Sequence, residues 1–483
     1  MEESIKKKTI FGFIWRFLQN AGTQIISFII SIVLARVLMP EDYGLVAMIT
    51  VFTNIALVFI NTGFSSAIVQ KKELTETDIN TVFYFGVAMG AVLYMLLYFC
   101  APLIAQFYSQ PRLVEMLRME SFVVIIGSFY SVPQALINRR MQFKKSFIVS
   151  LSGVLTQGIV GITLAYCGFG PWALIYGMLA NYGVNAVVMW VVVRWIPKLC
   201  FSVKSFRSMF MFSFKMLLSG LFDTVFNNIR SIIIGRQYTS TDLAYYNRGY
   251  QFPSLIMAQI DSSITTVLFS SLSKFQDDWD RGVMILRRAM KTSMYVCLPL
   301  IAGLCAVARP MVSLLLTDKW LPCVDYIRIT AVLCASWPLS ARRHALNSLG
   351  KSGTSLTLNI MGKIITLAAI FITYKHSVKA LIIGTVVASY LGQIVATIVY
   401  AKTLKYSIVN QLKDIIPSVL LSTFMGFSVW SITLLPIADL PLIILQVAAG
   451  IVIYVGLSKI FKMESFNYTL NLAKSILNKK TQG

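Results

Sequence analysis

The sequence predicts an all-α polytopic membrane protein, and three observations lead to that class. First, 57% of its 483 residues are hydrophobic and only 13% are charged, whereas roughly 25% of the residues of a soluble domain are charged. Second, the mean hydropathy is +0.71, and apolar runs long enough to cross a bilayer recur along the whole chain. Third, basic residues gather in alternate connections between these runs, as they do in membrane proteins.

The apolar runs predict about fourteen transmembrane helices. The connections between them are short, so no soluble domain is expected. Helix boundaries read from hydropathy are uncertain by several residues. The expected helices lie at about 10–38, 44–69, 79–107, 114–137, 147–167, 171–196, 208–235, 244–270, 293–316, 324–349, 355–374, 379–401, 414–435 and 441–461.

The distribution of lysine and arginine predicts the orientation. If the N-terminus lies inside, the inner connections carry most of the basic residues, among them Lys6 to Lys8 and Arg139 with Arg140. The outer connections hold little more than Arg112, Lys319, Lys375 and Lys379. This asymmetry predicts that both termini are cytoplasmic. The net charge of +23 then reflects topology and attraction to anionic lipids, so nucleic acid is not an expected partner.

An internal repeat groups the helices. Five residues of the first two helices return in ungapped register two hundred positions later: Ser31, Ile32, Arg36, Asp42 and Phe52 reappear as Ser231, Ile232, Arg236, Asp242 and Phe252. Six helices separate the start of one copy from the start of the next, and because six is an even number the halves are predicted to be parallel repeats. The expected organisation is a lobe of six helices at 1–200, a second at 201–405, two extra helices at 406–462 and a cytoplasmic amphipathic tail at 463–483.

Polar residues form a stripe on the first helix of each copy. They recur every three or four positions, which is helical periodicity on otherwise apolar segments. Small polar residues in such a stripe also serve helix packing, but charges inside a membrane are costly and usually face a wet cavity. The expected cavity residues are Arg16, Asn20 and Gln24 in the first copy, Lys215, Asn227 and Arg230 in the second, and Arg248 and Gln251 on the following helix.

The charges inside the expected spans are mostly basic, which predicts an anionic passenger. Guanidinium groups suit phosphate because their fork binds two oxygens at once. Three carboxylates, Asp223, Asp261 and Asp325, are candidates for ion coupling, and pairing with Arg230 or Arg328 is the structural alternative. Glu115 and Glu120 also lie inside an expected span, without an assigned role. The expected driving force is an H⁺ gradient, a Na⁺ gradient or the membrane potential.

Motifs for chemistry are scarce. The seven cysteines form no CxxC pair, and the two histidines show no metal-binding spacing. The sequence has neither a phosphate-binding glycine-rich loop nor a nucleophile elbow. We therefore expect no metal, no cofactor and no enzymatic activity. A membrane enzyme such as a glycan polymerase or ligase is the alternative from another class, but it would need a large outer loop, which the sequence lacks.

Several stretches resemble a known transporter family. LARVLMPEDYGLVAM at 34–48 and GFSSAIVQKKELTETDINTVFYF at 63–85 resemble the N-terminal signature of the polysaccharide transporter family of the MOP flippase superfamily. The likeness covers essentially the whole chain. Four further stretches are similar to the colanic acid and teichuronic acid exporter branch: NRRMQFKK at 138–145, YYNRGYQFP at 245–253, LFSSLSKFQDDWDRG at 268–282 and LLLTDKWLPCVDYIRI at 314–329.

The resemblance implies a flippase in the bacterial inner membrane. Such a protein turns undecaprenyl-diphosphate-linked oligosaccharides to the outer leaflet for O-antigen, capsule or exopolysaccharide synthesis, in functional connection with a polymerase and glycosyltransferases. The resemblance also implies a V-shaped, MATE-like bundle that works by alternating access. Two other passengers remain as alternatives on this scaffold, a peptidoglycan lipid precursor and, with cation coupling, a drug.

The resemblance further implies that basic residues of helices 1, 2, 7 and 8 line the cavity. In this sequence the matching residues are Arg16, Lys215, Arg230 and Arg248. The second helix offers only Asn54 and Asn61, which departs from the family pattern. Drug antiporters typically carry an acidic residue in the first helix, where this chain has Asn20 and Gln24.

Overall fold

The protein is described by a computed structural model covering residues 2–272, 279–348 and 350–471. Within these ranges the side chains of residues 2–14, 16, 17, 259, 261–272, 279 and 280 lie outside the description. The described residues form α-helices and short 3₁₀ turns, without a strand among them. The class predicted from composition, an all-α membrane protein, is therefore confirmed in its secondary structure.

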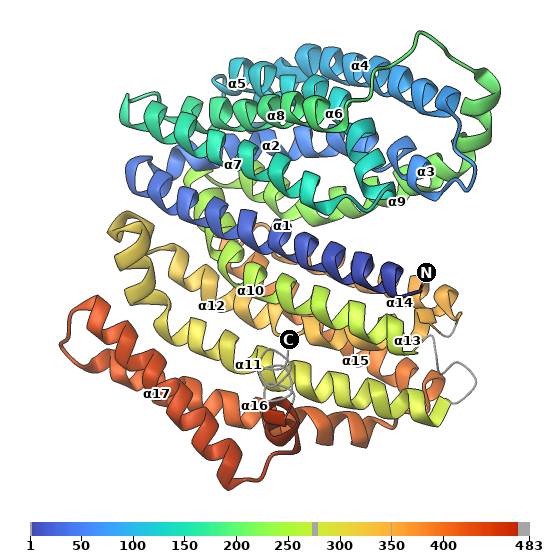
Figure 1. Ribbon diagram of the computed structural model, residues 1–483. Helices are drawn as coiled ribbons and strands as arrows, with labels where there is room; N and C mark the ends of the chain where they lie inside the picture. Colours follow the sequence, from blue (N-terminus) through green and yellow to red (C-terminus); the bar gives the residue numbers. More distant parts are fainter. Residues whose placement is uncertain (1, 273–278, 349, 472–483) are drawn as a thin grey trace. The chain divides into compact units, whose positions relative to one another are not determined.

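The chain divides into two compact units, residues 1–244 and 245–483. The first unit holds nine helices, coloured blue to green in Figure 1, and the start of a tenth. The predicted division into lobes at residue 200 rests on the repeat and stays a prediction. The helices of the first unit are α1 (Glu2–Val37), α2 (Pro40–Asn61), α3 (Phe64–Gln70), α4 (Glu76–Tyr108), α5 (Leu113–Glu120), α6 (Phe122–Arg139), α7 (Phe143–Tyr166), α8 (Pro171–Val193) and α9 (Val203–Gln237).

The second unit contains most of α10 and all later helices. Two short helices and three 3₁₀ turns lie between its long helices. Its elements are α10 (Ser240–Leu272), α11 (Trp279–Leu316), η1 (Asp318–Trp320), α12 (Cys323–Cys334), η2 (Trp337–Ser340), α13 (Ala341–Ser348), α14 (Ser352–Thr373), α15 (Val378–Thr403), α16 (Ile408–Ser431), η3 (Ile432–Leu434) and α17 (Asp439–Ile460).

Twelve helical segments of the described chain are long and apolar enough to cross a membrane. The other two expected spans, 244–270 and 324–349, correspond to α10 and to the series α12, η2 and α13. Neither α12 nor α13 alone reaches the roughly 20 residues that a crossing needs, and α10 carries several polar residues. The chain is a multi-pass membrane protein, and the count of fourteen stays a prediction.

Helix boundaries repeat with the predicted interval. The helices α1 and α9 end at Val37 and Gln237, and α2 and α10 begin at Pro40 and Ser240. The repeated aspartate explains the shared start: Asp42 accepts a hydrogen bond from the Met39 amide at 3.0 Å, and Asp242 accepts one from the Thr239 amide at 3.2 Å. A carboxylate three residues into a helix satisfies an amide that the helix leaves free.

Close helix contacts hold the first unit together. α2 packs against α5, α6 and α9, and α7 lies along both α1 and α8. The glycine at position 44 permits one such contact, since a Cβ atom there would stand 1.8 Å from the backbone oxygen of Ser240. Between α2, α4 and α6 the core contains an apolar cluster built from Ala56, Ile60, Leu93, Leu97 and Val124.

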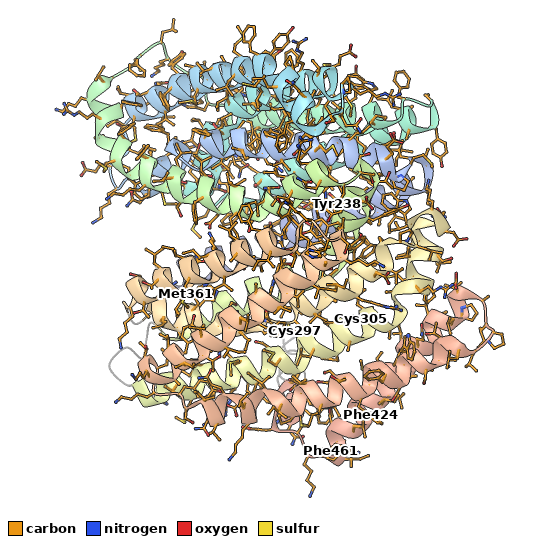
Figure 2. The ribbon with its side chains drawn as sticks, turned by 180° about the vertical axis from the view of Figure 1, so that it is seen from behind. Tyr238, Cys297, Cys305, Met361, Phe424 and Phe461 are labelled. Carbon is orange, nitrogen blue, oxygen red and sulfur yellow. The ribbon has the colours of Figure 1, made fainter. Side chains whose placement is uncertain are left out.

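The second unit packs around α11, which contacts α12, α13, α16 and α17. Cys297 on α11 is 1% exposed and packs with Ile301 and Ala331 as a small core residue. The outer surface is apolar instead of charged: Phe424 on α16, labelled in Figure 2, is 59% exposed. Exposed apolar side chains over whole helices suit a surface that faces lipid.

An ion pair and a cation–π contact connect residues 464–471 to α11. Lys291 pairs with Asp414 at 3.2 Å and with Glu464 at 2.8 Å. Residues 464–471 are helical, and Arg288 lies over the ring of Tyr468, 5.1 Å from its centroid. The predicted amphipathic tail thus begins as a helix held against the second unit. Residues 472–483 lie outside the described residues.

Candidate functional site

The polar stripe of α1 is exposed where the structure describes it. Asn20 and Gln24 are both exposed. Gln19, one position from Asn20, instead donates a hydrogen bond to Ser150 of α7 at 3.2 Å, as expected for a polar group that serves helix packing. The side chain of Arg16 lies outside the described residues, so its place in the cavity stays a prediction.

The equivalent stripe on α9 is also exposed along most of its length. Lys215, Asp223 and Asn227 are exposed, and Arg230 is half-buried one turn further on. An adjacent face of α9 packs against α2, where Val58 and Thr62 lie over Gly220. The helix therefore uses one face for packing and offers the predicted polar face to its surroundings.

On α10 the structure brings two predicted residues together. Arg248 donates a hydrogen bond from Nη1 to Oε1 of Gln251 at 2.8 Å, and its guanidinium lies 5.2 Å from the ring centroid of Trp320. Arg248 is only 5% exposed. A guanidinium over an indole face gains cation–π attraction and loses conformational freedom. Arg248 is thus a positioned, mostly buried cation, and its contact with a substrate phosphate stays a prediction.

The three predicted coupling carboxylates lie in different settings. Asp325 pairs with Lys379, not with Arg328, which donates instead to the backbone oxygen of Cys305 at 3.4 Å. Both side chains of the Asp325 pair are about half exposed, at 49% and 54%. Asp223 is exposed on α9. The side chain of Asp261 lies outside the described residues. A coupling role for any of them stays a prediction.

One buried carboxyl has no assigned role in the sequence-based prediction. Glu120, the last residue of α5, is 0% exposed. Thr50 and Thr53 of α2 each place Oγ1 2.9 Å from its Oε1. Two sequence signals pointed there: an acidic residue inside the expected span at 114–137, and two threonines three positions apart on the span at 44–69. Neither signal shows that the two spans meet at these residues.

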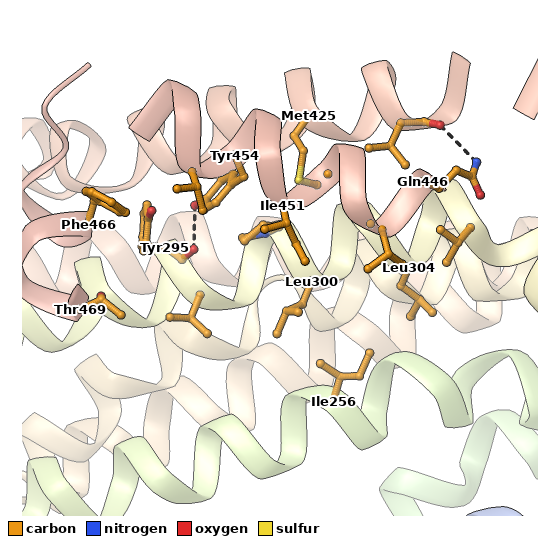
Figure 3. Close-up of a pocket in the computed structure, with 18 of the residues that line it drawn as sticks. Ile256, Tyr295, Leu300, Leu304, Met425, Gln446, Ile451, Tyr454, Phe466 and Thr469 are labelled. Atoms are coloured by element: carbon orange, nitrogen blue, oxygen red, sulfur yellow. Dashed lines mark hydrogen bonds between the residues drawn. The ribbon is translucent and has the colours of Figure 1, made fainter. Parts of the chain in front are cut away.

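The second unit contains an apolar groove that sequence reasoning did not anticipate (Figure 3). It has a volume of about 620 Å³ and lies between α11, α16 and α17, with Ile256 of α10 at one side. The residues of α11 and α17 that line it include Pro299, Leu300, Gly303, Leu304, Val307, Val447, Gly450, Ile451 and Val455. Phe466 and Leu470 of the final helical segment line one end.

Most polar groups at the groove are hydrogen-bonded within the protein, whereas Oε1 of Gln446 has no partner among the described residues. Tyr454 donates its hydroxyl hydrogen to the backbone oxygen of Tyr295 at 2.7 Å, and Gln446 donates to the backbone oxygen of Val429 at 3.2 Å. The remaining wall is hydrocarbon. Because the groove lies on membrane-spanning helices, its hydrocarbon wall suits a lipid chain.

The described residues contain no cluster of three or more histidine, cysteine, aspartate or glutamate side chains able to hold a metal ion. The candidate residues of the first unit therefore form a polar face on α1 and a polar face on α9. Those of the second unit are the positioned Arg248 on α10 and the residues of the apolar groove.

Comparisons with known proteins identify a matching family and several similar proteins. The profile of a family described as "Polysaccharide biosynthesis protein" matches residues 33–325. The chain is 26% identical to the succinoglycan biosynthesis transport protein ExoT of Rhizobium meliloti over 66% of this chain and 65% of ExoT. It is 25% identical to the teichuronic acid biosynthesis protein TuaB of Bacillus subtilis over 68% of this chain and 69% of TuaB.

Solved structures share the fold. The lipid II flippase MurJ in an inward closed conformation superposes with a TM-score of 0.75 at 16% identity, covering 93% of this chain and 98% of MurJ. An inward-facing MATE-family multidrug transporter of the MOP superfamily gives a TM-score of 0.62 at 14% identity, covering 79% and 94%. The predicted MOP-type fold is confirmed, and its V shape stays a prediction.

Proposed function

Because the chain belongs to the polysaccharide biosynthesis protein family, we propose that it is a flippase for lipid-linked oligosaccharides. Its substrate is an undecaprenyl-diphosphate-linked repeat unit, which it moves from the inner to the outer leaflet by alternating access. The product serves O-antigen, capsule or exopolysaccharide synthesis. The single observation that carries this proposal is the family match over residues 33–325 in a chain with twelve apolar spans.

The charged head of such a substrate is a diphosphate. The polar face of α9 supports an anionic passenger, because Lys215 is exposed and Arg230 is half-buried on a helix that carries five basic residues and one acidic residue, Asp223. In this proposal Arg16, Lys215, Arg230 and Arg248 contact the phosphates, while Asn20, Gln24, Asn227 and Gln251 donate hydrogen bonds to phosphate or sugar oxygens. Guanidinium and amide donors suit these acceptors.

The lipid tail requires an apolar path alongside. The groove between α11, α16 and α17 supports this part of the proposal, since its wall is mostly hydrocarbon and most of its polar groups are hydrogen-bonded to the protein. In this arrangement the head crosses among polar helices while the tail stays against lipid-facing helices. The tail therefore stays in an apolar environment and does not have to enter water.

The direction of transport agrees with the proposed location in the bacterial cytoplasmic membrane, with both termini in the cytoplasm. Moving a negative charge outward across an inside-negative membrane gains about 2.3 kcal/mol per charge per 100 mV. Return of the empty carrier is the step at which H⁺ or Na⁺ would couple. The flippase needs no cofactor and performs no bond chemistry, and its functional partners are the glycosyltransferases and polymerase of the same glycan.

The direct test is translocation of a fluorescent undecaprenyl-diphosphate oligosaccharide in proteoliposomes, followed by accessibility of the label to an external quencher. We expect flipping by the wild-type protein and loss of flipping in Arg230→Gln and Arg16→Gln. The matched control is Arg112→Gln, because Arg112 is an exposed residue outside the spans. Selective flipping of a peptidoglycan lipid precursor by the wild-type protein would contradict the proposed substrate.

A further inference from the structure

The carboxyl group of Glu120 has surroundings that a membrane protein rarely offers to an acidic side chain. It is 0% exposed, and its Oε2 is buried without a hydrogen-bond partner among the residues that the structure describes. Thr50 and Thr53 both approach the other oxygen, Oε1, at 2.9 Å. Oε1 of Glu120 therefore accepts two hydrogen bonds, and Oε2 accepts none from the described residues.

Charged neighbours do not neutralise the group. Glu120 takes part in no ion pair within the described part of the chain. Arg118, two residues earlier on α5, lies over the ring of Tyr98 at 4.3 Å from its centroid and donates to the Tyr98 backbone oxygen at 3.4 Å. An ionised carboxylate in this place would be a buried charge without a counter-charge, which is strongly disfavoured.

The other helices packed on α5 are α2, α4, α6 and α8. The groups that they bring near Glu120 are phenols and threonine hydroxyls, which carry no positive charge. Tyr182 of α8 interacts electrostatically with Glu120, and a phenol beside a carboxyl does not supply positive charge. On α4 the hydroxyl of Tyr108 is itself buried and unpartnered among the described residues. From α2 the groups that reach Glu120 are the two threonine hydroxyls.

The threonine hydroxyls do not replace the missing counter-charge. Each hydroxyl donates towards Oε1 of Glu120 and has only one hydrogen, and each also lies near a backbone carbonyl oxygen: Thr50 is 2.8 Å from that of Val46, and Thr53 is 3.1 Å from that of Thr50. Each hydrogen is therefore shared between two acceptors. Two shared hydrogen bonds to one oxygen leave Oε2 without a donor among the described residues, and burial of the uncompensated charge favours the protonated acid.

The position of Glu120 on a broken helix gives the proton a way to leave. The span 113–139 is interrupted here, since α5 ends at Glu120 and α6 begins at Phe122. Breaks in transmembrane helices of transporters mark places where ions bind and where helices rearrange. A small movement of α5 against α2 would separate Glu120 from the threonines and let water reach it.

From these contacts we propose that Glu120, with Thr50 and Thr53, forms a proton-binding site in the first unit that takes up and releases one H⁺ during the transport cycle. The site differs from the candidates Asp223, Asp261 and Asp325. Its role in transport rests on the proposed flippase function, whereas its protonation in this conformation does not. The two parts can therefore be tested separately.

Infrared spectroscopy of the purified protein in lipid nanodiscs at neutral pH tests protonation without any substrate. The spectrum of the wild-type protein minus that of Glu120→Gln should contain the C=O stretching band of a protonated carboxylic acid. Thr53→Val should move this band to higher frequency, because a hydrogen bond to the carboxyl is lost. Glu115→Gln is the matched control, since Glu115 is exposed five residues earlier on the same helix, and it should leave the band in place. Absence of the band from the difference spectrum would overturn the site.

Transport under an imposed pH gradient tests coupling. The wild-type flipping rate should change when the gradient is reversed, and the rate of Glu120→Gln should no longer respond, because glutamine mimics the protonated acid permanently. Glu115→Gln should respond as the wild type does. A response to Na⁺ with none to pH would overturn proton binding in favour of a metal cation. If the wild-type protein flips no labelled lipid while the infrared band is present, the flippase proposal fails and the proton site stands.

Discussion

Asp414 on α16 accepts two hydrogen bonds from the guanidinium of Arg287 on α11, Nε to Oδ2 at 2.8 Å and Nη2 to Oδ1 at 3.1 Å. Asp414 is 6% exposed. Lys291 approaches Oδ1 at 3.2 Å, and the hydroxyl of Tyr406 also donates to this carboxylate. The carboxylate therefore fastens α16 to α11, the helix on which one wall of the apolar groove is built.

We expect Asp414→Asn to destabilise the second unit. The substitution leaves two cations facing a neutral amide, and hydrogen bonds to charged groups contribute about 1.5–3 kcal/mol each. A loss of stability of about that size should appear as a lower midpoint in thermal unfolding of the detergent-solubilised protein. An unchanged midpoint would show that the pair does not hold the helices together.

The exposed pair of Asp325 and Lys379 provides the contrast. Because both side chains are about half exposed, Asp325→Asn should change stability by less than about 1 kcal/mol. The same variant tests the predicted coupling role. If flipping by Asp325→Asn keeps its dependence on H⁺ or Na⁺, the carboxylate serves only in the surface pair.

Filling the apolar groove should block the lipid tail. A Cβ atom at Gly303 meets nothing within 4 Å, so Gly303→Phe should fold while its ring occupies the groove. The ring removes the apolar surface against which the tail packs. We expect a lower flipping rate than that of the wild type at low substrate concentration.

The matched control for the groove is Gly456→Phe on α17. Gly456 likewise has open space around its Cβ position and does not line the groove. Flipping by this variant should match the wild type. Equal losses in the two variants would indicate a general effect of phenylalanine at the lipid surface and remove the tail-binding role.

Acid should weaken the packing of the helical segment 464–471 against α11. The hydrogen bond from Lys291 holds the pKa of Glu464 below its ordinary value of 4.5. A lowered folded-state pKa gives stabilisation that is present above the unfolded-state pKa and is lost as the pH falls through the folded-state value. The stabilisation from this ion pair is small, because the side chain of Glu464 is 72% exposed and water screens the interaction.

Hydrogen exchange of residues 464–471 measures this effect. Exchange should accelerate, relative to its intrinsic pH dependence, as the pH falls below about 4.5, the unperturbed glutamate value. Glu464→Gln should show no such acceleration in that range, since glutamine does not titrate. Identical pH profiles for the two proteins would contradict a docking role for the ion pair.

The sequence by itself determined the features that depend on local composition and spacing. Of the fourteen spans predicted from runs of hydrophobic residues, twelve are long and apolar enough to cross a membrane among the described residues, because lipid demands about twenty apolar residues per helix. The matching helix starts at Pro40 and Ser240 follow from the repeated Asp42 and Asp242, which cap amides only three residues away. The contact between Arg248 and Gln251 is likewise one helical turn long.

Only the tertiary structure decided which distant residues meet. Glu120 lies 67 positions from Thr53, and periodicity within a helix does not state which face of another helix it will contact. For the same reason the sequence did not predict the pairing of Asp325 with Lys379. It also did not predict the apolar groove, because the lining residues on α11 and α17 look like ordinary lipid-facing residues in the sequence. Packing between helices, which depends on the shapes of both surfaces, turned these separate signals into sites.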